Sequence, residues 1–579
     1  DPTARIEAPA FIGDNCRISA GVVIGSHTTI GSNAILSEDA TVAGSVIMEG
    51  AHVGSVARVR GAVLGRGASL ERGALLEEGA VVGDDVVVGA GAIVRPNVKI
   101  YPSKTVEAGA IVAHSIVRER RVARSLFGAR GVTGLVNIGV TPQTAVRLGM
   151  AYGTFLRRGS AVVAGRDASR AARTMKRALI AGLNSTGVHC YDLELVPMPV
   201  TRFSVRSEQA TGAINFRTSP KDPEIVEIRF MDAEGVDLSE ADQRKLERIF
   251  YREDYRRASP ARIGDIEFPP RALEQYTRGL LRGLDIPAIR ERAAKVVVDY
   301  AFGPASLIAP SLLGRLGCDA LGVNAFTDEY RPVLVASDLA ALTERLSEHV
   351  RKSGSDLGVL LEPGGEVARL VDDRGRVIPP DKALLVFLRH ELGRGATRFA
   401  LPVSASSAGE RLVEDAGGLI DWTPVSIASL MNRAAMPSID FAGSPDGSLI
   451  WPRFLPAPDG LMTFGKALEV VSVANRPLSE LVDEVPVAHM ARRDVATPWD
   501  LRGTVMRHVA SAEVPGRLVL IDGIKVVQDD GWVLVIPVPD EPVCRVWAEA
   551  STAAGAEELA DRYAAMVAEA AAADGEQTY

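Results

Sequence analysis

Aliphatic residues recur at every sixth position through the first part of the chain. The period holds from Ile6 to Val42, slips by one residue near positions 42–47 and 59–64, and then runs unbroken from Leu64 to Val112. Glycine often follows the aliphatic residue, and small residues dominate two positions before it. A six-residue period fits neither a 3.6-residue helix nor an alternating strand. It predicts a triangular coil over residues 1–117, with the aliphatic side chains inside and small residues at the corners.

This pattern resembles the hexapeptide-repeat left-handed parallel β-helix. Some proteins with that coil are histidine-dependent acyltransferases, but nothing places His27, His52 or His114 beside an acyl donor. A coil that flanks another domain more commonly mediates contacts between subunits. We therefore expect a homo-oligomer whose subunits associate through the β-helix. Residues 1–18 also look like the start of the coil that follows the catalytic domain in sugar-phosphate nucleotidyltransferases. The glycine-rich nucleotide-binding signature of that catalytic domain is absent from this sequence.

From about Ser125, strand and helix patterns alternate instead. The apolar run at residues 161–164 is typical of a buried strand, and the next strand is expected at residues 189–193. Between them, Met175, Leu179 and Leu183 repeat at four-residue spacing, which indicates a helix. The result is a βαβ unit, and its pattern returns further along the chain. We therefore predict three similar α/β domains and a smaller fourth, at residues 124–260, 265–370, 371–482 and 486–579.

The composition excludes several classes of function. The chain has 579 residues, 47% of them hydrophobic, which is enough for several independent cores. Its net charge of −8 argues against a nucleic-acid partner. Four scattered cysteines without a C-x-x-C pair favour a reduced, cytoplasmic protein, and no apolar run approaches the roughly 18 residues of a membrane helix. The chain begins at Asp1, with neither an initiator methionine nor a signal peptide, so we expect a missing upstream segment.

A hairpin with a serine at its tip is predicted at residues 212–230. An apolar run reaches Phe216 and stops at the polar turn Arg217–Pro220. The segment Ile225–Phe230 then alternates apolar and polar residues, which predicts a half-buried strand. Ser219-Pro220 is by itself ordinary turn chemistry.

The same stretch resembles the catalytic-serine loop of the α-D-phosphohexomutases, the family of phosphomannomutases and phosphoglucomutases. Their loop reads approximately GGIMITASHNPPEYNGIKF, and Ser219 stands at the position of its serine. Residues 127–134, FGARGVTG, are similar to the family motif FGTDGIRG. The resemblance spans residues 124–579 and implies four domains around one cleft. It also implies a phosphoserine, a magnesium held by three aspartates, a lysine base, and loops that grip the sugar and its phosphate.

The resemblance makes Ser219 and Arg229 the catalytic candidates and Lys221 a substrate-binding one. Pro220 and Lys221 replace the histidine and asparagine that follow the family's serine, and Arg229 replaces the family's lysine. A guanidinium group stays protonated, so Arg229 can hold an oxyanion but is a very poor proton acceptor.

Residues 362–367, the metal loop, align with the family motif DGDGDR. Glu362 and Glu366 replace two of its aspartates, while Gly364 replaces the middle ligand and Val367 the arginine. Magnesium demands near-ideal octahedral oxygen geometry, which two glutamates beside a proline match poorly. We expect vestigial ligands and no cofactor, with Mg²⁺ bound only if mutase activity survives. The simpler interpretation is a loop of solvated carboxylates at a strand end.

The sugar and phosphate loops of the family are also altered. Ser444, Asp446 and Ser448 replace the glutamate, serine and histidine of the sugar loop and stay candidates for substrate binding. At residues 536–542, IPVPDEP replaces a loop close to RPSGTEP, and its two acidic residues would repel a phosphate. Arg545 is the one cation nearby, and an arginine on a strand edge is more often a surface residue.

Three interpretations stay open. The RTSP sequence at residues 217–220 closely resembles bacterial fusion proteins in which a mannose-1-phosphate guanylyltransferase domain precedes a β-helix and a phosphomannomutase-like region. This resemblance implies a weak or inactive mutase of GDP-mannose metabolism that binds a sugar phosphate or nucleotide sugar, with an upstream nucleotidyltransferase domain as its partner. The second interpretation is a working phosphohexomutase that uses Ser219 as a phosphoserine. The third is a module that only binds and regulates.

Overall fold

The computed structural model describes residues 1–102, 104–112, 115–116, 126–137, 139–220, 222–329, 334–498, 501–511, 516–539 and 541–573. His114, Lys221 and Asp540 lie outside these ranges. The chain divides into two compact units: the first consists mainly of residues 1–125, and the second of residues 126–495 and 504–572. No helix in the described ranges is long and apolar enough to span a bilayer.

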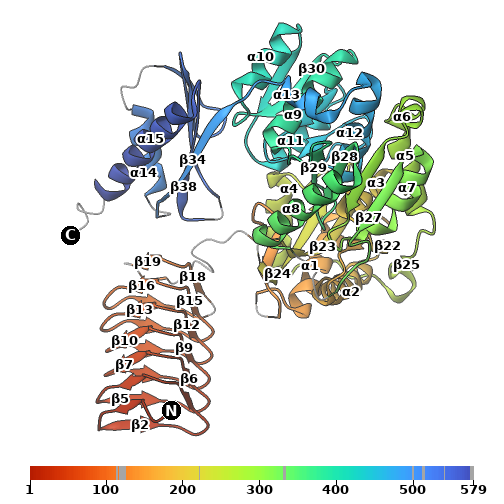
Figure 1. Cartoon of the computed structure of the whole chain (residues 1–579). Coiled ribbons are helices and arrows are strands. Elements are labelled where there is room, and N and C mark those ends of the chain that lie inside the picture. Colours follow the sequence, from red (N-terminus) through yellow and green to blue (C-terminus); the bar gives the residue numbers. More distant parts are fainter. Residues whose placement is uncertain are drawn as a thin grey trace. The chain divides into compact units, whose positions relative to one another are not determined.

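The N-terminal unit consists of short parallel strands in three sheets (Figure 1). The first sheet has the order β1 (Arg5–Ile6), β4 (Val23–Ile24), β7 (Thr41–Ala43), β10 (Arg58–Arg60), β13 (Leu75–Leu76), β16 (Ile93–Val94) and β19 (Ile111–Val112). The second has the order β17 (Lys99–Ile100), β14 (Val81–Val82), β11 (Val63–Leu64), β8 (Val46–Ile47), β5 (Thr28–Ile30) and β2 (Ala10–Ile12). The third has the order β18 (Thr105–Val106), β15 (Val87–Val88), β12 (Ser69–Leu70), β9 (His52–Val53), β6 (Ile35–Leu36) and β3 (Arg17–Ile18). Each strand pairs with the third strand along the chain, which is consistent with the predicted β-helix.

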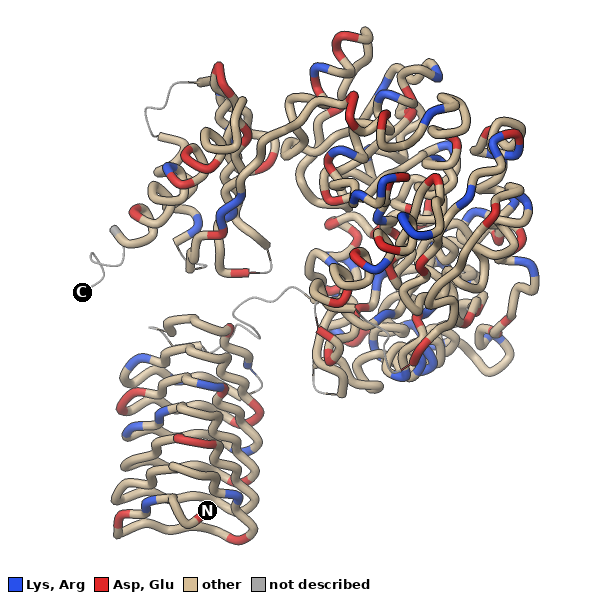
Figure 2. Tube along the Cα trace, viewed as in Figure 1, with Lys and Arg blue, Asp and Glu red and all other residues tan. Residues whose placement is uncertain are grey.

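The six-residue period places its aliphatic side chains inside this unit. Those from Ile24 to Val112 are buried in one core, and the slips continue it through Ile47, Val53 and Val59. Ile6 is an exception, because its side chain is 54% exposed. Its strand β1 lies at the end of a sheet and, of the described strands, pairs only with β4. None of them covers the Ile6 side chain from the other side. Basic and acidic residues are scattered along this unit (Figure 2).

The first α/β sheet has the order β20 (Val132–Leu135), β24 (Asp222–Met231), β23 (Gly212–Ser219), β21 (Ala161–Arg166), β22 (His189–Leu195) and β25 (Ile266–Glu267). The pairs β23–β21, β21–β22 and β22–β25 are parallel, and β24 pairs antiparallel with β23 and β20. Its helices are α1 (Pro142–Phe155), α2 (Arg170–Ser185), α3 (Met198–Ser207) and α4 (Glu240–Arg252). Helix α1 begins as its sequence suggests: the Thr141 side chain accepts from the Thr144 N–H over 3.1 Å, and Pro142 follows the cap.

The second sheet has the order β27 (Asp319–Val323), β26 (Lys295–Asp299), β28 (Leu357–Leu361) and β29 (Ala368–Asp372). Helices α5 (Ala272–Arg282), α6 (Ile286–Arg292), α7 (Ala309–Leu316) and α8 (Ala336–Ser353) belong to the same region. The third sheet has the order β31 (Leu419–Thr423), β30 (Arg398–Pro402), β32 (Phe441–Gly443) and β33 (Leu449–Ile450). Its helices are α9 (Pro380–Gly393), α10 (Ser407–Asp415), α11 (Ile427–Ala434), α12 (Gly460–Ala474) and α13 (Leu478–Asp483). In both sheets three parallel strands are followed by one antiparallel strand.

The fourth sheet has the order β34 (His489–Ala496), β38 (Val543–Ala550), β37 (Gly531–Pro537), β36 (Ile524–Gln528) and β35 (Arg517–Val519). Helices α14 (Arg502–Ser511) and α15 (Ala553–Ala573) accompany it. The limits predicted for the four domains stay predictions.

Buried polar contacts join the fourth sheet to the third α/β region. Lys525 Nζ lies 4.1 Å from the centre of the Trp532 ring and donates to the Val403 carbonyl over 2.7 Å. Burial lowers the pKa of Lys525 to about 8. Trp532 Nε1 donates to Glu549 over 2.7 Å, and the same carboxylate accepts from the Ser407 N–H over 3.0 Å. These contacts attach the fourth sheet to Ser407, at the start of helix α10, and to Val403, just after β30.

Candidate functional site

The predicted hairpin is present as β23 and β24, and Ser219 is the last residue of β23. The register of the two strands shifts between Thr218 and Ser219. The Thr218 N–H donates to Asp167 Oδ2 over 2.7 Å, which ties this end of β23 to the residue that follows β21. Ser219 is 3% exposed, so the serine is buried and does not stand out on an open turn.

Strand β24 differs from its prediction, because over residues 226–231 both of its faces are buried where one was expected to meet solvent. Val226, Ile228 and Phe230 pack in the apolar core of this domain. Glu227 and Arg229 point to the other face and are buried as well. A buried charge is tolerated only when it is paired. The alternation of apolar and polar residues along this strand therefore reports a charged interior and not a solvated face.

Arg217 provides the first pairing. It lies opposite Glu227 in the hairpin, and its Nε donates to Glu227 Oε2 over 2.8 Å. Its Nη1 donates to Glu366 Oε2, also over 2.8 Å. One guanidinium therefore bridges the hairpin and the metal loop, which follows β28 in the next domain.

Arg202 and Arg229 complete the arrangement around the same carboxylate. Arg202, on α3, has its Nη2 2.8 Å from Asp237 Oδ1 and 3.4 Å from Glu366 Oε1. Arg229 Nη1 lies 3.4 Å from Asp237 Oδ2 and 3.9 Å from Glu366 Oε1. Arg130 adds a contact of 3.2 Å to Glu227 from the outer side. We call this set the charged cluster: Arg130, Arg202, Arg217, Glu227, Arg229, Asp237 and Glu366.

The electrostatics of the cluster follow from burial and mutual attraction. Burial raises the pKa of Glu366, but attraction to Arg229, Arg217 and Arg202 outweighs it and lowers that pKa to about 2. The pKa of Glu227 is also lowered, since Arg217 and Arg229 outweigh its burial. Burial, and then repulsion from Arg217, lower the pKa of Arg229. The neighbouring arginines thus favour the carboxylate forms of Glu366 and Glu227.

The backbone of the metal loop is anchored as well. The Met198 N–H donates to the Gly364 carbonyl over 3.0 Å, and the Gly460 N–H donates to the Gly365 carbonyl over 2.9 Å. Glu362 accepts from Arg369 Nε over 2.9 Å. The simple expectation of solvated carboxylates in this loop is therefore wrong for Glu366, which three arginines surround. Glu362 is 25% exposed and pairs with Arg369.

The sugar-loop residues form a tight turn between β32 and β33. The Ser444 N–H donates to the Ser448 carbonyl over 2.9 Å, and the Ser448 N–H donates to Asp446 Oδ1 over 2.9 Å. Both serines are buried. The turn satisfies these backbone groups internally.

Arg545 lies on β38 and pairs with Asp494 of β34, with its Nε 2.7 Å and its Nη2 3.1 Å from the carboxylate. Its guanidinium also lies 5.6 Å from the centre of the Trp547 ring. The remaining substrate-binding candidate, Lys221, lies outside the described residues.

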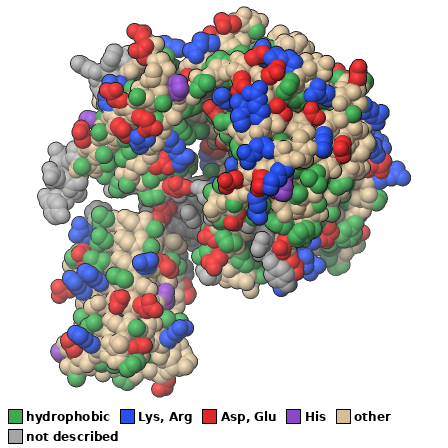
Figure 3. All heavy atoms as spheres, in the orientation of Figure 1, with side chains coloured by type: hydrophobic (Ala, Val, Ile, Leu, Met, Phe, Trp, Pro, Cys, Tyr) green, Lys and Arg blue, Asp and Glu red, His purple; other side chains and the backbone are tan. Residues whose placement is uncertain are grey.

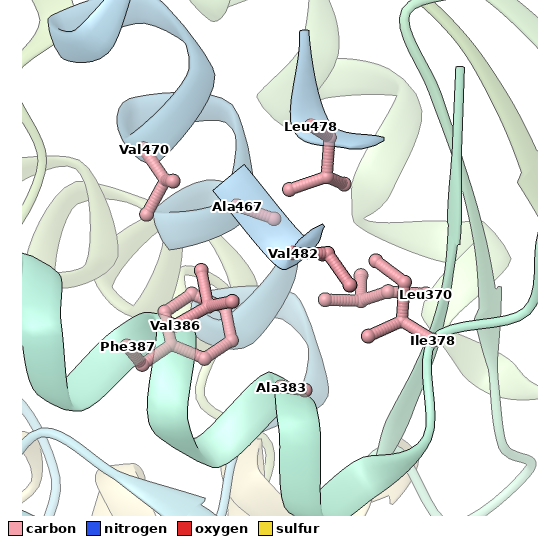
Figure 4. A pocket seen from close by; sticks show the side chains of 9 residues that line it. All are labelled: Leu370, Ile378, Ala383, Val386, Phe387, Ala467, Val470, Leu478 and Val482. Carbon is pink, nitrogen blue, oxygen red and sulfur yellow. The ribbon is translucent and has the colours of Figure 1, made fainter. Parts of the chain in front are cut away.

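A small apolar cavity lies between α9, α12, α13 and β29, and it is not an alternative ligand-binding site. Figure 4 shows nine apolar side chains around it. Its volume of about 10 Å³ is that of a single water at most, and it lacks polar partners for one. On the face shown in Figure 3, acidic and basic side chains are intermixed over the α/β domains. The absence of a nucleic-acid partner stays a prediction.

Comparison with known proteins agrees with this fold. Residues 124–257 match the family description "Phosphoglucomutase/phosphomannomutase, alpha/beta/alpha domain I", and residues 379–488 match domain III of the same family. Residues 6–120 match the "GMPPB C-terminal domain". A phosphoglucomutase/phosphomannomutase of Thermococcus kodakarensis is 30% identical over 433 residues, which cover 74% of this chain and 95% of that protein. The chain belongs to the phosphoglucomutase/phosphomannomutase family.

Other relatives and solved structures point the same way. A probable phosphoglucosamine mutase of Methanococcoides burtonii is 30% identical over 73% of this chain and 95% of its own length. The structure of a phosphoglucomutase/phosphomannomutase family protein from Burkholderia thailandensis superposes with a TM-score of 0.68 at 22% identity, and covers 78% of this chain and 98% of its own. A putative phosphomannomutase from Thermus thermophilus superposes with a TM-score of 0.64 at 22% identity, and covers 76% of this chain and 98% of its own. At these identities the superpositions show the shared α-D-phosphohexomutase fold.

Enzymes of this phosphohexomutase family typically use Mg²⁺, but the metal loop of this chain does not fit that ion. Three guanidinium groups surround the Glu366 carboxylate, and Arg369 holds Glu362. Among the described residues, no group of three His, Cys, Asp or Glu side chains is placed to hold a metal. An octahedral, oxygen-rich shell cannot form where the available oxygens already accept from arginine.

The structure brings together two of the site residues expected from the sequence. These are Arg229 and Glu366, which lie 3.9 Å apart in the charged cluster. The sugar-loop residues make the contacts above within their own turn, and Arg545 pairs on its own sheet. Sequence reasoning missed Arg202, Arg217 and Glu227. A local signal was present for two of them, since Arg217 and Glu227 flank the turn at positions that face each other in a hairpin.

Proposed function

We propose that this phosphohexomutase-family protein acts in nucleotide-sugar metabolism, centred on GDP-mannose, as a binding and regulatory region and not as an efficient mutase. Its ligand would be a sugar phosphate or a nucleotide sugar. The observation that carries the proposal is the charged cluster, because it fills the position of the family's base and metal loop with ion pairs.

The chemistry of the cluster supports low mutase activity. Phosphoryl transfer depends mostly on positioning and charge neutralisation, and in this family on a base and a metal. Arg229 remains protonated at physiological pH and cannot take a proton from a sugar hydroxyl. A catalytic metal supplies several kcal/mol of charge stabilisation, and the loss of about 4 kcal/mol lowers a rate by roughly 10³.

The N-terminal unit supports a role in assembly. We propose that its three parallel sheets form a left-handed β-helix through which subunits associate. The match to the GMPPB C-terminal domain supports a link between this coil and a nucleotidyltransferase. In this proposal such a domain precedes residue 1, the protein is cytoplasmic, and ligand binding to the α/β domains regulates that partner.

Two experiments test the proposal. Coupled turnover of mannose and glucose phosphates with Mg²⁺ and a hexose bisphosphate activator is expected to be absent or at least roughly 10³-fold below that of a family enzyme. Calorimetric titration with GDP-mannose, mannose 1-phosphate and glucose 1-phosphate is expected to show binding of at least one. Failure of all three to bind at millimolar concentration would leave a purely architectural role.

The alternative is an active phosphohexomutase, and it is favoured by the retained Ser219 and by relatives whose names are those of mutases. It predicts robust turnover that Ser219→Ala abolishes, together with a phosphoserine at this position by mass spectrometry. The burial of Ser219 opposes it, since the serine must meet the sugar phosphate.

A further inference from the structure

We propose that Arg202, Arg217 and Arg229 form an anion-binding site that the chain's own Glu366 fills, and that the phosphate of a phosphomonoester competes with Glu366 for it. This inference deepens the proposed binding of a sugar phosphate and rests on it. It assigns the phosphate-binding role to arginines of the first α/β domain, in place of the altered phosphate loop of the fourth.

The geometry around Glu366 is that of a bound anion. Its carboxylate meets guanidinium groups from three different elements, α3, β23 and β24, at 3.4, 2.8 and 3.9 Å. Arginine is well suited to such convergence, because its planar fork presents several N–H donors to carboxylate or phosphate oxygens. A tetrahedral phosphate has more acceptor oxygens than a carboxylate and can engage the three groups together.

The charge balance favours a dianion over Glu366. The cluster holds four guanidinium groups, those of Arg130, Arg202, Arg217 and Arg229, joined to three carboxylates by contacts of 3.9 Å or less. Its net charge is therefore +1 with Glu366 in place. Exchange of that monoanion for a phosphomonoester dianion brings the cluster to neutrality, which a buried site prefers.

Two hydrogen-bond donors without partners also favour a bound phosphate. The Nε–H groups of Arg202 and Arg229 are buried and, within the described part of the chain, have no hydrogen-bond partner. Arg202 is fully buried and the side chain of Arg229 is 7% exposed. Buried donors without partners are unfavourable, so a ligand with additional acceptor oxygens would be stabilised there.

The exchange needs little rearrangement. Hydrogen bonds at Gly364 and Gly365 fix the backbone of the loop, so rotation of the Glu366 side chain is sufficient. Its side chain is 15% exposed, whereas that of Glu227 is 1% exposed, so solvent reaches Glu366. Gly364 permits the close approach, because a Cβ at this position would lie 3.1 Å from Arg217 Nη1.

The test compares the wild type with Glu366→Gln and with Glu362→Gln, the same substitution in the same loop at a residue that pairs with Arg369 outside the cluster. The probe is inorganic phosphate, titrated by calorimetry at constant ionic strength with chloride. We expect Glu366→Gln to bind phosphate at least tenfold more tightly than the wild type. Glu362→Gln should gain clearly less, because Glu362 pairs with Arg369 and reaches Arg217 only through its charge. The double variant Arg229→Gln/Glu366→Gln is expected to lose the gain.

Equal phosphate affinity in all of these proteins would overturn the inference. If Glu366→Gln does not fold, Glu366→Asp keeps the charge but shortens the side chain, and it should bind phosphate more tightly than the wild type; no gain there would also overturn it. The results of this test can be told apart from those that test the proposed function. Wild-type binding of GDP-mannose without a phosphate gain in Glu366→Gln would reject this site alone. A gain without any wild-type binding of sugar phosphates or GDP-mannose would reject the proposed function and keep the site.

Discussion

Arg217 of β23 faces Glu227 of β24 across the hairpin, and the other end of its guanidinium holds Glu366 from the following domain. Both contacts measure 2.8 Å. The single side chain therefore pairs with two carboxylates that lie 139 positions apart in the sequence. It joins the serine hairpin to the metal loop.

Arg217→Ala should strongly destabilise the protein. The change leaves the nearly buried carboxylates of Glu227 and Glu366 without their best partner, and breaking a buried pair from one side typically costs about 3–5 kcal/mol. Urea unfolding followed by circular dichroism measures the loss. Arg369→Ala is the matched control, because it breaks a pair whose arginine is 40% exposed and should cost less than about 1 kcal/mol. Similar losses in the two variants would contradict the bridging role of Arg217.

Stability should fall in acid partly through Glu366. Its pKa is lowered from 4.5 to about 2 by the arginines, so its contribution is present above pH 4.5 and is lost as the pH falls towards 2. A shift of this size corresponds to a contribution on the order of 3 kcal/mol. Unfolding free energies of the wild type and of Glu366→Gln, measured from about pH 6 to about pH 2.5, give the test. The wild type should lose more stability than the variant over this range, and parallel curves would show that Glu366 is not held by the cluster.

Val82→Asp should disrupt the N-terminal coil. Val82 is 1% exposed and belongs to the apolar core of that unit, where an unpaired carboxylate costs several kcal/mol. Val81→Asp is the control, because the adjacent Val81 side chain is 37% exposed and points away from that core. Thermal melts and sedimentation of the two variants test the difference. A coil that tolerates both substitutions equally would mean that the six-residue period does not mark its interior.

Much of the fold could be predicted because its signals are local. Ile24 to Val112 are buried at the positions that the six-residue period marks, since each side of the coil repeats the same short strand and corner. The hairpin, expected at residues 212–230 and present at residues 212–231, was also predicted, because a turn sequence between two extended runs is a local signal. The half-buried face expected for β24 was wrong, because no local pattern tells whether a row of polar side chains faces water or buried partners.

The candidate site shows where sequence reasoning ends. The sequence by itself determined the family, the position of Ser219, and the replacement of the family's lysine and aspartates by Arg229, Glu362 and Glu366. It left open whether those glutamates were solvated, metal-bound or paired. Only the tertiary structure decided that Glu366 meets Arg202, Arg217 and Arg229, because an ion pair depends on the distance between charges in space and on the solvent removed around them. Neither quantity is written in the order of residues along the chain.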